Sequence, residues 1–171
     1  MKTLMLALFA AAATPLATLA ADMPKVGDKA PDFSVAASDG TTFHLKDNIG
    51  KGTVILYFYP KDDTPGCTKE ACGLRDTMDE FKGLNATVFG VSFDSVGSHK
   101  AFIAKYKLPF VLLADTDKSV AKLYGVANDS SKVASRVTFV IDKAGTIAYV
   151  NPHVNPATHA AELQAVLKKL G

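Results

Sequence analysis

The chain has 171 residues, of which 48% are hydrophobic and 21% are charged, and its formal net charge is +2. These values are typical of a globular protein with a real core, and so small a charge gives no reason to expect nucleic acid or an anionic membrane surface as a partner. The chain has two cysteines and four histidines.

The first 21 residues have the pattern of an export signal. Lys2 gives a positive start, an apolar run with small residues follows at 4–13, and Pro15 interrupts it. The run is too short to serve as a permanent transmembrane anchor. The alternative is an N-terminus that is disordered or lies on a membrane, but the order of its parts favours a signal.

We expect cleavage after Ala20 or Ala21, because small residues precede both positions. The remaining residues, 22–171, number about 150 and suit one domain. The expected location is outside the cytoplasm, in a bacterial periplasm, with no stable membrane association after cleavage.

Strands and helices alternate along the rest of the sequence. In chain order we expect a hairpin formed by 33–35 and 42–45 around Asp39-Gly40, a buried strand at 53–59, a helix at 64–81, a strand at 87–93, a helix at 98–107, a strand at 110–114, a helix at 118–124, strands at 137–141 and 146–150, and an amphipathic helix at 156–170. This order predicts an α/β domain with a mixed central sheet and helices on both faces.

The turn from the first central strand into the helix at 64–81 carries the most informative residues. Thr64 is the candidate N-cap, Pro65 suits the first helical position, and Cys67 then occupies the third. Free N–H groups and the positive end of the helix dipole stabilise a thiolate there. The Thr64 hydroxyl is expected to point back at the same position as a cap, while Pro60 stiffens the loop.

Cys67 and Cys72 are five residues apart in this helix. Helical geometry separates their α-carbons by about 8–9 Å, whereas a disulfide needs less than about 7 Å. The two sulfurs can therefore bond only if the first turns unwind. A permanent structural disulfide is therefore disfavoured, whereas a disulfide that forms and breaks reversibly is possible, so we favour redox chemistry.

Metal binding is a further alternative, and the spacing does not favour it. Two cysteines five apart, with scattered histidines, do not form a zinc pattern. We expect no metal and no cofactor. The histidines are interpreted as surface or loop residues: His44, His99, His153 and His159.

These residues resemble the peroxiredoxin signature Pro-x-x-x-Thr-x-x-Cys, present as Pro60, Thr64 and Cys67. The longer stretch 57–76 resembles the bacterioferritin comigratory protein, or PrxQ, branch, whose second cysteine lies five positions after the first. The resemblance extends over nearly all of the chain after the leader, including 27–33, 136–142 and 154–159.

The resemblance implies a role for each matching residue. Cys67 resembles the peroxidatic cysteine, which attacks a hydroperoxide and becomes a sulfenic acid, and Cys72 resembles the resolving cysteine, which forms a disulfide with it. Thr64 and Arg136 match the positions that orient the peroxide and stabilise the thiolate. Pro60 matches the proline that shields the thiolate.

It also implies the fold and the partners. The family has a thioredoxin fold with an added N-terminal hairpin, reduces hydrogen peroxide and organic hydroperoxides in antioxidant defence, and is reduced by thioredoxin or a similar dithiol protein. Relatives in this branch are often monomers, so we expect a monomer.

Two residues and one loop leave alternatives open. Without the resemblance, an arginine such as Arg136 at the start of a buried strand is more often a surface residue. Glu70 either positions Arg136 or is a solvated carboxylate near the helix N-terminus. The polar loop 127–135 is shorter than in many relatives, which bears on substrate preference and reductant docking.

Two other functions compete with a peroxidase. The first is an exported thiol–disulfide oxidoreductase of the thioredoxin kind, but its C-x-x-C spacing is missing. The second is a binding or structural module with incidental cysteines.

Overall fold

The computed structural model describes residues 22–171, and the expected signal peptide at 1–21 lies outside the described residues. In chain order the elements are β1 (Ser34–Ala37), β2 (Thr42–His44), the 3-10 helix η1 (Leu45–Asp47), β3 (Thr53–Phe58), α1 (Pro65–Asp76), α2 (Met78–Gly83), β4 (Ala86–Ser92), α3 (Val96–Tyr106), β5 (Val111–Ala114), α4 (Ser119–Leu123), β6 (Val137–Ile141), β7 (Ile147–Asn151) and α5 (His159–Leu170). No helix in this range is long and apolar enough to cross a membrane.

The strands form a single mixed sheet in the order β2-β1-β5-β4-β3-β6-β7. The three central strands β5, β4 and β3 run parallel, and β6 and β7 continue the sheet in antiparallel pairing on one side. The hairpin of β1 and β2 extends it on the other side, with β1 antiparallel to β5. This is the predicted mixed sheet, with the N-terminal hairpin at one edge.

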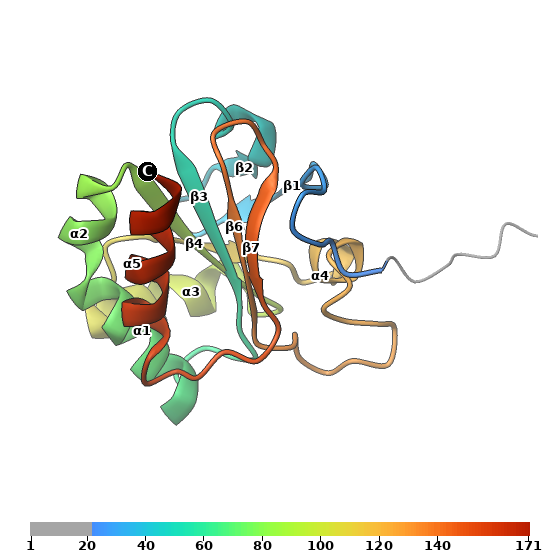
Figure 1. The fold of residues 1–171 in the computed structure, drawn as a ribbon. Coiled ribbons are helices and arrows are strands. Elements are labelled where there is room, and N and C mark those ends of the chain that lie inside the picture. Colours follow the sequence, from blue (N-terminus) through green and yellow to red (C-terminus); the bar gives the residue numbers. More distant parts are fainter. Residues whose placement is uncertain (1–21) are drawn as a thin grey trace, which may run out of the picture.

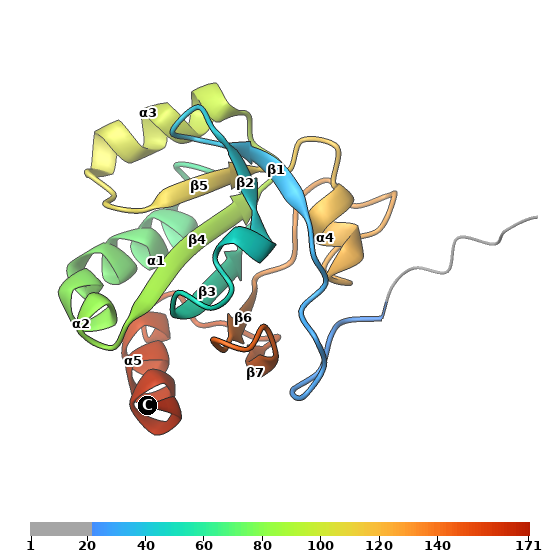
Figure 2. The same ribbon diagram turned by 90° about the horizontal axis from the view of Figure 1, so that it is seen from above.

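Each face of the sheet has its own apolar core. Because side chains alternate along a strand, Leu56 and Phe58 of β3 face α4, whereas Ile55 and Tyr57 face α1, α2, α3 and α5. Figures 1 and 2 show the same division, with α4 alone on its side of the sheet. The strands are therefore buried on both faces, as their continuous apolar sequences predict.

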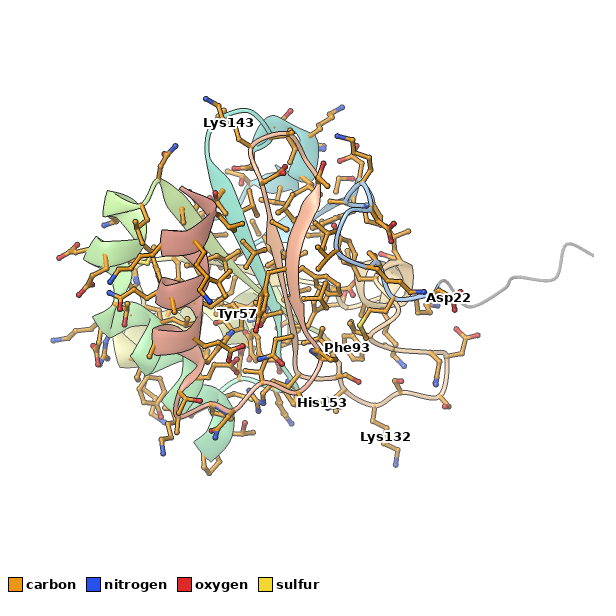
Figure 3. All side chains as sticks on the ribbon, viewed as in Figure 1. Asp22, Tyr57, Phe93, Lys132, Lys143 and His153 are labelled. Carbon is orange, nitrogen blue, oxygen red and sulfur yellow. The ribbon has the colours of Figure 1, made fainter. Side chains whose placement is uncertain are left out.

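Gly90 of β4 makes room for an aromatic ring from the neighbouring strand. A Cβ built there would lie 2.7 Å from the ring of Tyr57, so no larger residue fits without displacing that ring. Tyr57 is stacked on Tyr59 at 5.3 Å between ring centroids, and Figure 3 shows it between the sheet and the helices. Burial, followed by the charges of Glu70 and Asp62, raises the pKa of Tyr57 well above its usual value, so its hydroxyl stays protonated.

The carboxyl end of β3 and the amino end of β6 lie at the same end of the sheet. The two strands are antiparallel, and Phe58 near the end of β3 pairs with Val137 at the start of β6. The chain enters α1 at this end. Figure 3 places His153 and Lys132 there and Lys143 at the opposite end.

One predicted element is wrong in its extent. The helix expected at 64–81 is two helices, because Thr77 leaves helical geometry with φ −105° and ψ 10°. Its hydroxyl donates a 3.0 Å hydrogen bond to the carbonyl of Gly73, and such bonds from threonine to the preceding turn bend helices. The remaining predicted elements are confirmed with small shifts at their ends, and η1 is an addition that the sequence pattern did not indicate.

Candidate active site

Cys67 lies at the third position of α1, as predicted, with Pro65 at the first. The helix begins with the backbone of Thr64, whose carbonyl accepts a 2.8 Å hydrogen bond from the N–H of Thr68. The first N–H groups of such a helix have no acceptor within the helix. Cys67 is 2% exposed, so water has little access to its sulfur in this first turn.

The predicted cap by the Thr64 side chain is wrong. The hydroxyl makes no capping hydrogen bond and instead donates a 3.0 Å hydrogen bond to the carbonyl of Lys61. This hydrogen bond lies within the loop between β3 and α1 and restrains it. Pro60, at the start of the loop, is half-buried. Thr64 begins the helix through its backbone alone.

Arg136 reaches the sulfur of Cys67. Its Nη2 lies 3.2 Å from Sγ, and its Nη1 contacts Oε2 of Glu70 in an ion pair. Burial disfavours the charge of Arg136, but the carboxylate of Glu70 and the sulfur of Cys67 outweigh it, so the pKa of Arg136 is raised above its usual value. A guanidinium this close stabilises a thiolate and can donate to developing oxygen charge.

Glu70 is 1% exposed, so the alternative of a solvated surface carboxylate is wrong. It lies on the buried stripe of α1 with Cys67, Ala71 and Leu74. The turn geometry that brings residues three and four apart onto one face places it beside Cys67. Its carboxylate contacts Nη1 of Arg136, while Nη2 of the same guanidinium lies beside the sulfur.

His159, at the start of α5, contacts the second oxygen of Glu70. Its Nδ1 lies 2.9 Å from Oε1, although the ring is not aligned for a well-formed hydrogen bond. Its Nε2 lies 3.0 Å from the hydroxyl of Thr138 on β6. The cluster thus joins α1, β6 and α5 behind the sulfur.

The prediction that all four histidines are surface or loop residues is wrong for two of them, because His99 and His159 are buried at 0% and 1% exposure. The missed signal is helical spacing. His159 stands four and eight residues before Leu163 and Leu167, on the apolar stripe of its helix. A polar residue on such a stripe needs a buried partner.

Cys72 is half-buried, and both cysteines are free thiols. α1 is continuous from Pro65 to Asp76, so the two cysteines lie on different faces of an intact helix, as predicted. Beyond Cys72, Arg75 donates a 2.7 Å hydrogen bond to the carbonyl of Tyr106 in α3. This bond fixes the end of α1 that need not move if the first turns unwind.

The loop before α1 is held by a second buried cluster. Asp62 accepts hydrogen bonds from the hydroxyls of Tyr59 at 2.6 Å and Ser98 at 2.7 Å, and its Oδ2 lies 2.9 Å from Nδ1 of His99. Burial acts to raise the pKa of Asp62, but His99, Tyr59 and Ser98 outweigh it and lower the pKa. No role was predicted from the sequence for Asp62 or His99.

An exposed ion pair holds the neighbouring residue of the loop. Asp63, in left-handed backbone conformation with φ 54°, accepts hydrogen bonds from Lys105 at 2.6 Å and from the hydroxyl of Tyr106 at 2.5 Å. Both partners belong to the last turn of α3. The loop is thereby fixed to α3 at two successive residues, 62 and 63.

Residues 22–171 contain no group of three histidine, cysteine or acidic side chains placed to hold a metal ion. A surface pocket lies between α3 and β5, at Ile103, Leu108 and Phe110 among others. It contains none of the residues described above.

The AhpC/TSA family matches residues 26–150. Among curated proteins, the chain is 47% identical over 145 residues to "Putative peroxiredoxin bcp" of Coxiella burnetii, an alignment that covers 81% of this chain and 95% of the relative. It is 42% identical over 146 residues to the chloroplastic peroxiredoxin Q of Triticum aestivum, covering 84% of this chain and 67% of the relative.

Solved structures give the same result. Peroxidoxin BcpB of Mycobacterium tuberculosis is similar with a TM-score of 0.81 and 34% identity, covering 86% of this chain and 99% of that one. The bacterioferritin comigratory protein of Xanthomonas campestris, described as reducing alkyl peroxides, has a TM-score of 0.75 and 33% identity, covering 81% and 91%. These likenesses confirm the predicted thioredoxin fold.

Proposed function

The chain belongs to the AhpC/TSA family of peroxiredoxins, and we propose that Cys67 is the cysteine on which it reduces hydroperoxides. As a peroxiredoxin of the PrxQ branch it is a thiol-dependent peroxidase. The observation that carries the assignment is the 3.2 Å contact between Sγ of Cys67 and Nη2 of Arg136. It joins a buried sulfur at a helix start to a permanent positive charge.

In the first step the thiolate of Cys67 attacks the terminal oxygen of the hydroperoxide. The S–O bond forms as the O–O bond breaks, the attacked oxygen keeps its hydrogen, and Cys67 becomes a sulfenic acid. The other oxygen leaves as alkoxide or hydroxide and takes a proton from water. Arg136 is placed to stabilise the negative charge as it moves from sulfur to the leaving oxygen. Thr64 and Pro60 are proposed to orient the peroxide and shield the sulfur.

In the second step Cys72 attacks the sulfenic sulfur. The S–S bond forms, the S–O bond breaks, and the departing hydroxide leaves as water with the proton of Cys72. Because α1 separates the two cysteines too far for a disulfide, this step requires unwinding of its first turns. Arg75 would hold the far end of α1 in place during that motion, whereas the contacts of Cys67 and Glu70 with Arg136 and His159 would have to break.

An external dithiol completes the cycle. Two thiolates transfer two electrons to the Cys67–Cys72 disulfide and become a disulfide themselves. We propose a thioredoxin-like protein as the donor and hydrogen peroxide and organic hydroperoxides as substrates. The alkyl peroxide activity described for the Xanthomonas campestris relative supports organic substrates.

Peroxide consumption with dithiothreitol tests the assignment. Wild type is expected to turn over many times, and Cys67→Ser not at all. Cys72→Ser keeps its first reaction with peroxide but changes how the sulfenic acid is reduced. Full turnover by Cys67→Ser would refute the assignment.

We also propose that the protein is exported to a periplasm and is a monomer. The signal-like pattern of residues 1–21 supports export. The exposed large apolar residues in 22–171 are scattered over different segments: Val26, Leu123, Val133 and Leu170. N-terminal sequencing of protein from a periplasmic fraction, and light scattering of the purified domain, test the two proposals. Cytoplasmic retention of the intact chain, or a dimer mass, would contradict them.

A further inference from the structure

We propose that His159 is a positioning residue for peroxide reduction: through Glu70 it holds Arg136 against Cys67, and the same contact must open before Cys67 can reach Cys72. The proposal rests on the roles given to the two cysteines above. It adds a residue of the C-terminal helix, far along the chain from both cysteines, to the control of the reaction.

The side chains form one continuous line behind the sulfur. Arg136 contacts Sγ with one nitrogen and Glu70 with the other. The second oxygen of Glu70 lies 2.9 Å from Nδ1 of His159. Both oxygens of the carboxylate are therefore occupied, one by Arg136 and the other by His159, and the orientation of the carboxylate depends on both.

Thr138 sets the orientation of the imidazole. Its hydroxyl lies 3.0 Å from Nε2 of His159, and it can donate to that nitrogen while Nδ1–H faces the carboxylate of Glu70. The ring is closed off from water at 1% exposure, and Thr138 is fixed in β6, so the imidazole has a rigid support.

Oε1 of Glu70 has a 2.9 Å contact with Nδ1 of His159 that is not a well-aligned hydrogen bond, and loss of the imidazole would remove this contact. A buried carboxylate in that position turns toward another partner or shifts toward water. Because Arg136 is bound to the same carboxylate, its guanidinium would move with it and away from the best position on the sulfur. The first chemical step would then slow, although His159 touches neither the sulfur nor the peroxide.

The second consequence follows from the place of Glu70 in α1. It lies between Cys67 and Cys72, so unwinding that brings the cysteines together must carry Glu70 out of its contacts with Arg136 and His159. The contact between Glu70 and His159 is short but poorly aligned, a geometry suited to opening. Weakening it should therefore speed disulfide formation while it slows peroxide attack.

Two variants of His159 separate the contact from the space that the ring fills. His159→Asn keeps an amide donor near the place of Nδ1, whereas His159→Leu keeps volume and removes both nitrogens. Leu163→Val is the matched control, because Leu163 lies one turn further along the same buried face of α5 and is completely buried. It loosens the packing of α5 without touching Glu70.

Rapid quenching followed by intact mass measures the two steps separately. The rate of oxygen addition is measured in a Cys72→Ser background, and the rate of loss of two hydrogens in the chain with both cysteines. For His159→Leu we expect peroxide attack to slow about fivefold, which is less than the loss of a well-formed hydrogen bond to a charged group because the contact is poorly aligned, and disulfide formation to accelerate severalfold. His159→Asn and Leu163→Val should stay within about threefold of wild type in both steps.

Opposite changes in the two rates are the readout that a merely structural role would not give. The proposal is overturned if both rates of His159→Leu fall together, if neither changes, or if Leu163→Val reproduces the split. If His159→Leu does not fold, Thr138→Val carries the same test, with the same opposite directions and a smaller effect. Oxygen addition that persists in Cys67→Ser would instead refute the proposed function, so the two failures are distinguishable.

Discussion

Two buried histidine–carboxylate pairs flank the start of α1, and they differ in how completely they are hydrogen-bonded. Asp62, in the loop before the helix, accepts from two hydroxyls and from His99. Glu70, inside the helix, has Arg136 on one oxygen and only the poorly aligned contact with His159 on the other. The first pair fixes its segment, and the proposed mechanism requires the second pair to open.

The histidines differ in the same way. Nδ1 of His99 faces the carboxylate of Asp62, and its Nε2 lies 3.1 Å from the carbonyl of Leu113. Each ring nitrogen of His99 therefore faces an acceptor. Nδ1 of His159, by contrast, is poorly aligned with Glu70, and its Nε2 faces a hydroxyl. The proposed reaction needs two conformations of α1, and the well-bonded loop before the helix can stay fixed while the helix changes between them.

The largest expected effect on the rate of peroxide reduction comes from a change beside the Glu70–His159 pair. Arg136→Met removes the charge beside Cys67, and we expect the rate constant of oxidation by peroxide to fall by about 10²–10³-fold, the usual loss for one preorganised donor to transition-state charge. Asp62→Asn, at the fixed pair, should change this rate constant only severalfold, because Asp62 does not contact the sulfur. Quenching and intact mass in a Cys72→Ser background measure both.

The control for Arg136→Met is Arg75→Met, which removes an arginine from the far end of the same helix, where it binds the carbonyl of Tyr106. Its oxidation rate constant should remain within about threefold of wild type. A comparable loss in Arg75→Met, or none in Arg136→Met, would break the comparison between the two regions.

The loss of stability should be larger at the Asp62–His99 pair than at the Glu70–His159 pair, the reverse of the order expected for the reaction rates. Asp62→Asn removes a buried carboxylate oxygen that accepts from Ser98 and faces His99, and we expect the free energy of unfolding to fall by about 3 kcal/mol. Glu70→Gln should cost only about 1–2 kcal/mol, because its main partner Arg136 keeps access to water and the Glu70–His159 contact is weak to begin with. Urea denaturation measures both, and equal losses would contradict the distinction drawn here.

The pH dependence of stability sharpens the comparison further. The pKa of Asp62 is lowered in the folded protein, so the folded state binds this proton less readily than the unfolded chain, where the pKa is about 3.9. Its stabilising contribution is therefore complete above that value and is lost as the pH falls through the folded pKa. The difference in unfolding free energy between wild type and Asp62→Asn should shrink as the pH falls below about pH 4.

That difference removes the contributions of other carboxylates, which titrate in the same range in both proteins. Urea denaturation at a series of pH values between 3 and 7 measures it. A difference that grows on acidification would have the wrong sign for a lowered pKa and would sink this account of Asp62.

The smallest effect belongs to the exposed pair in the same loop. Asp63→Asn removes the contact with Lys105, and we expect a loss of less than about 1 kcal/mol, since solvent and salt screen exposed ion pairs. Asp129→Asn, which removes the exposed pair with Lys122 on the opposite side of the molecule, is the control. Urea denaturation at low and high salt should show that both losses shrink with salt. A large, salt-independent loss at Asp63 would indicate that it, too, fixes the loop.

Sequence patterns predict the frame of this molecule well, because its apolar strands and its turn residues act locally. The continuous apolar stretch ending at Phe58 and the alternation around Asp39-Gly40 predict β3 and the N-terminal hairpin. The break at Thr77 is different, since a hydroxyl bond to Gly73 decides it and the surrounding residues all favour a helix. Helix propensity averaged over the neighbouring residues does not detect a break at a single residue.

The residues of the site also divide into those that a local pattern predicts and those that it does not. Cys67, Cys72 and Thr64 belong to one local motif, whereas Arg136 reaches the sulfur from 69 residues away through the antiparallel pairing of β6 with β3. Only the family resemblance suggested that contact. The burial of His99 could have been predicted, because it lies three residues before Phe102 on one helical stripe. Its partner Asp62 could not, because it lies 37 residues away in a polar loop. Side chains that meet across elements leave no local pattern.

The most direct test of the central claim is the intact mass of the reduced protein after one equivalent of hydrogen peroxide, measured for wild type and Cys72→Ser. The account predicts that wild type loses two hydrogens and that Cys72→Ser gains one oxygen, located on Cys67 by peptide mapping. Oxygen retained on Cys67 in the wild type, with no loss of hydrogens, would contradict the reaction between these two sulfurs.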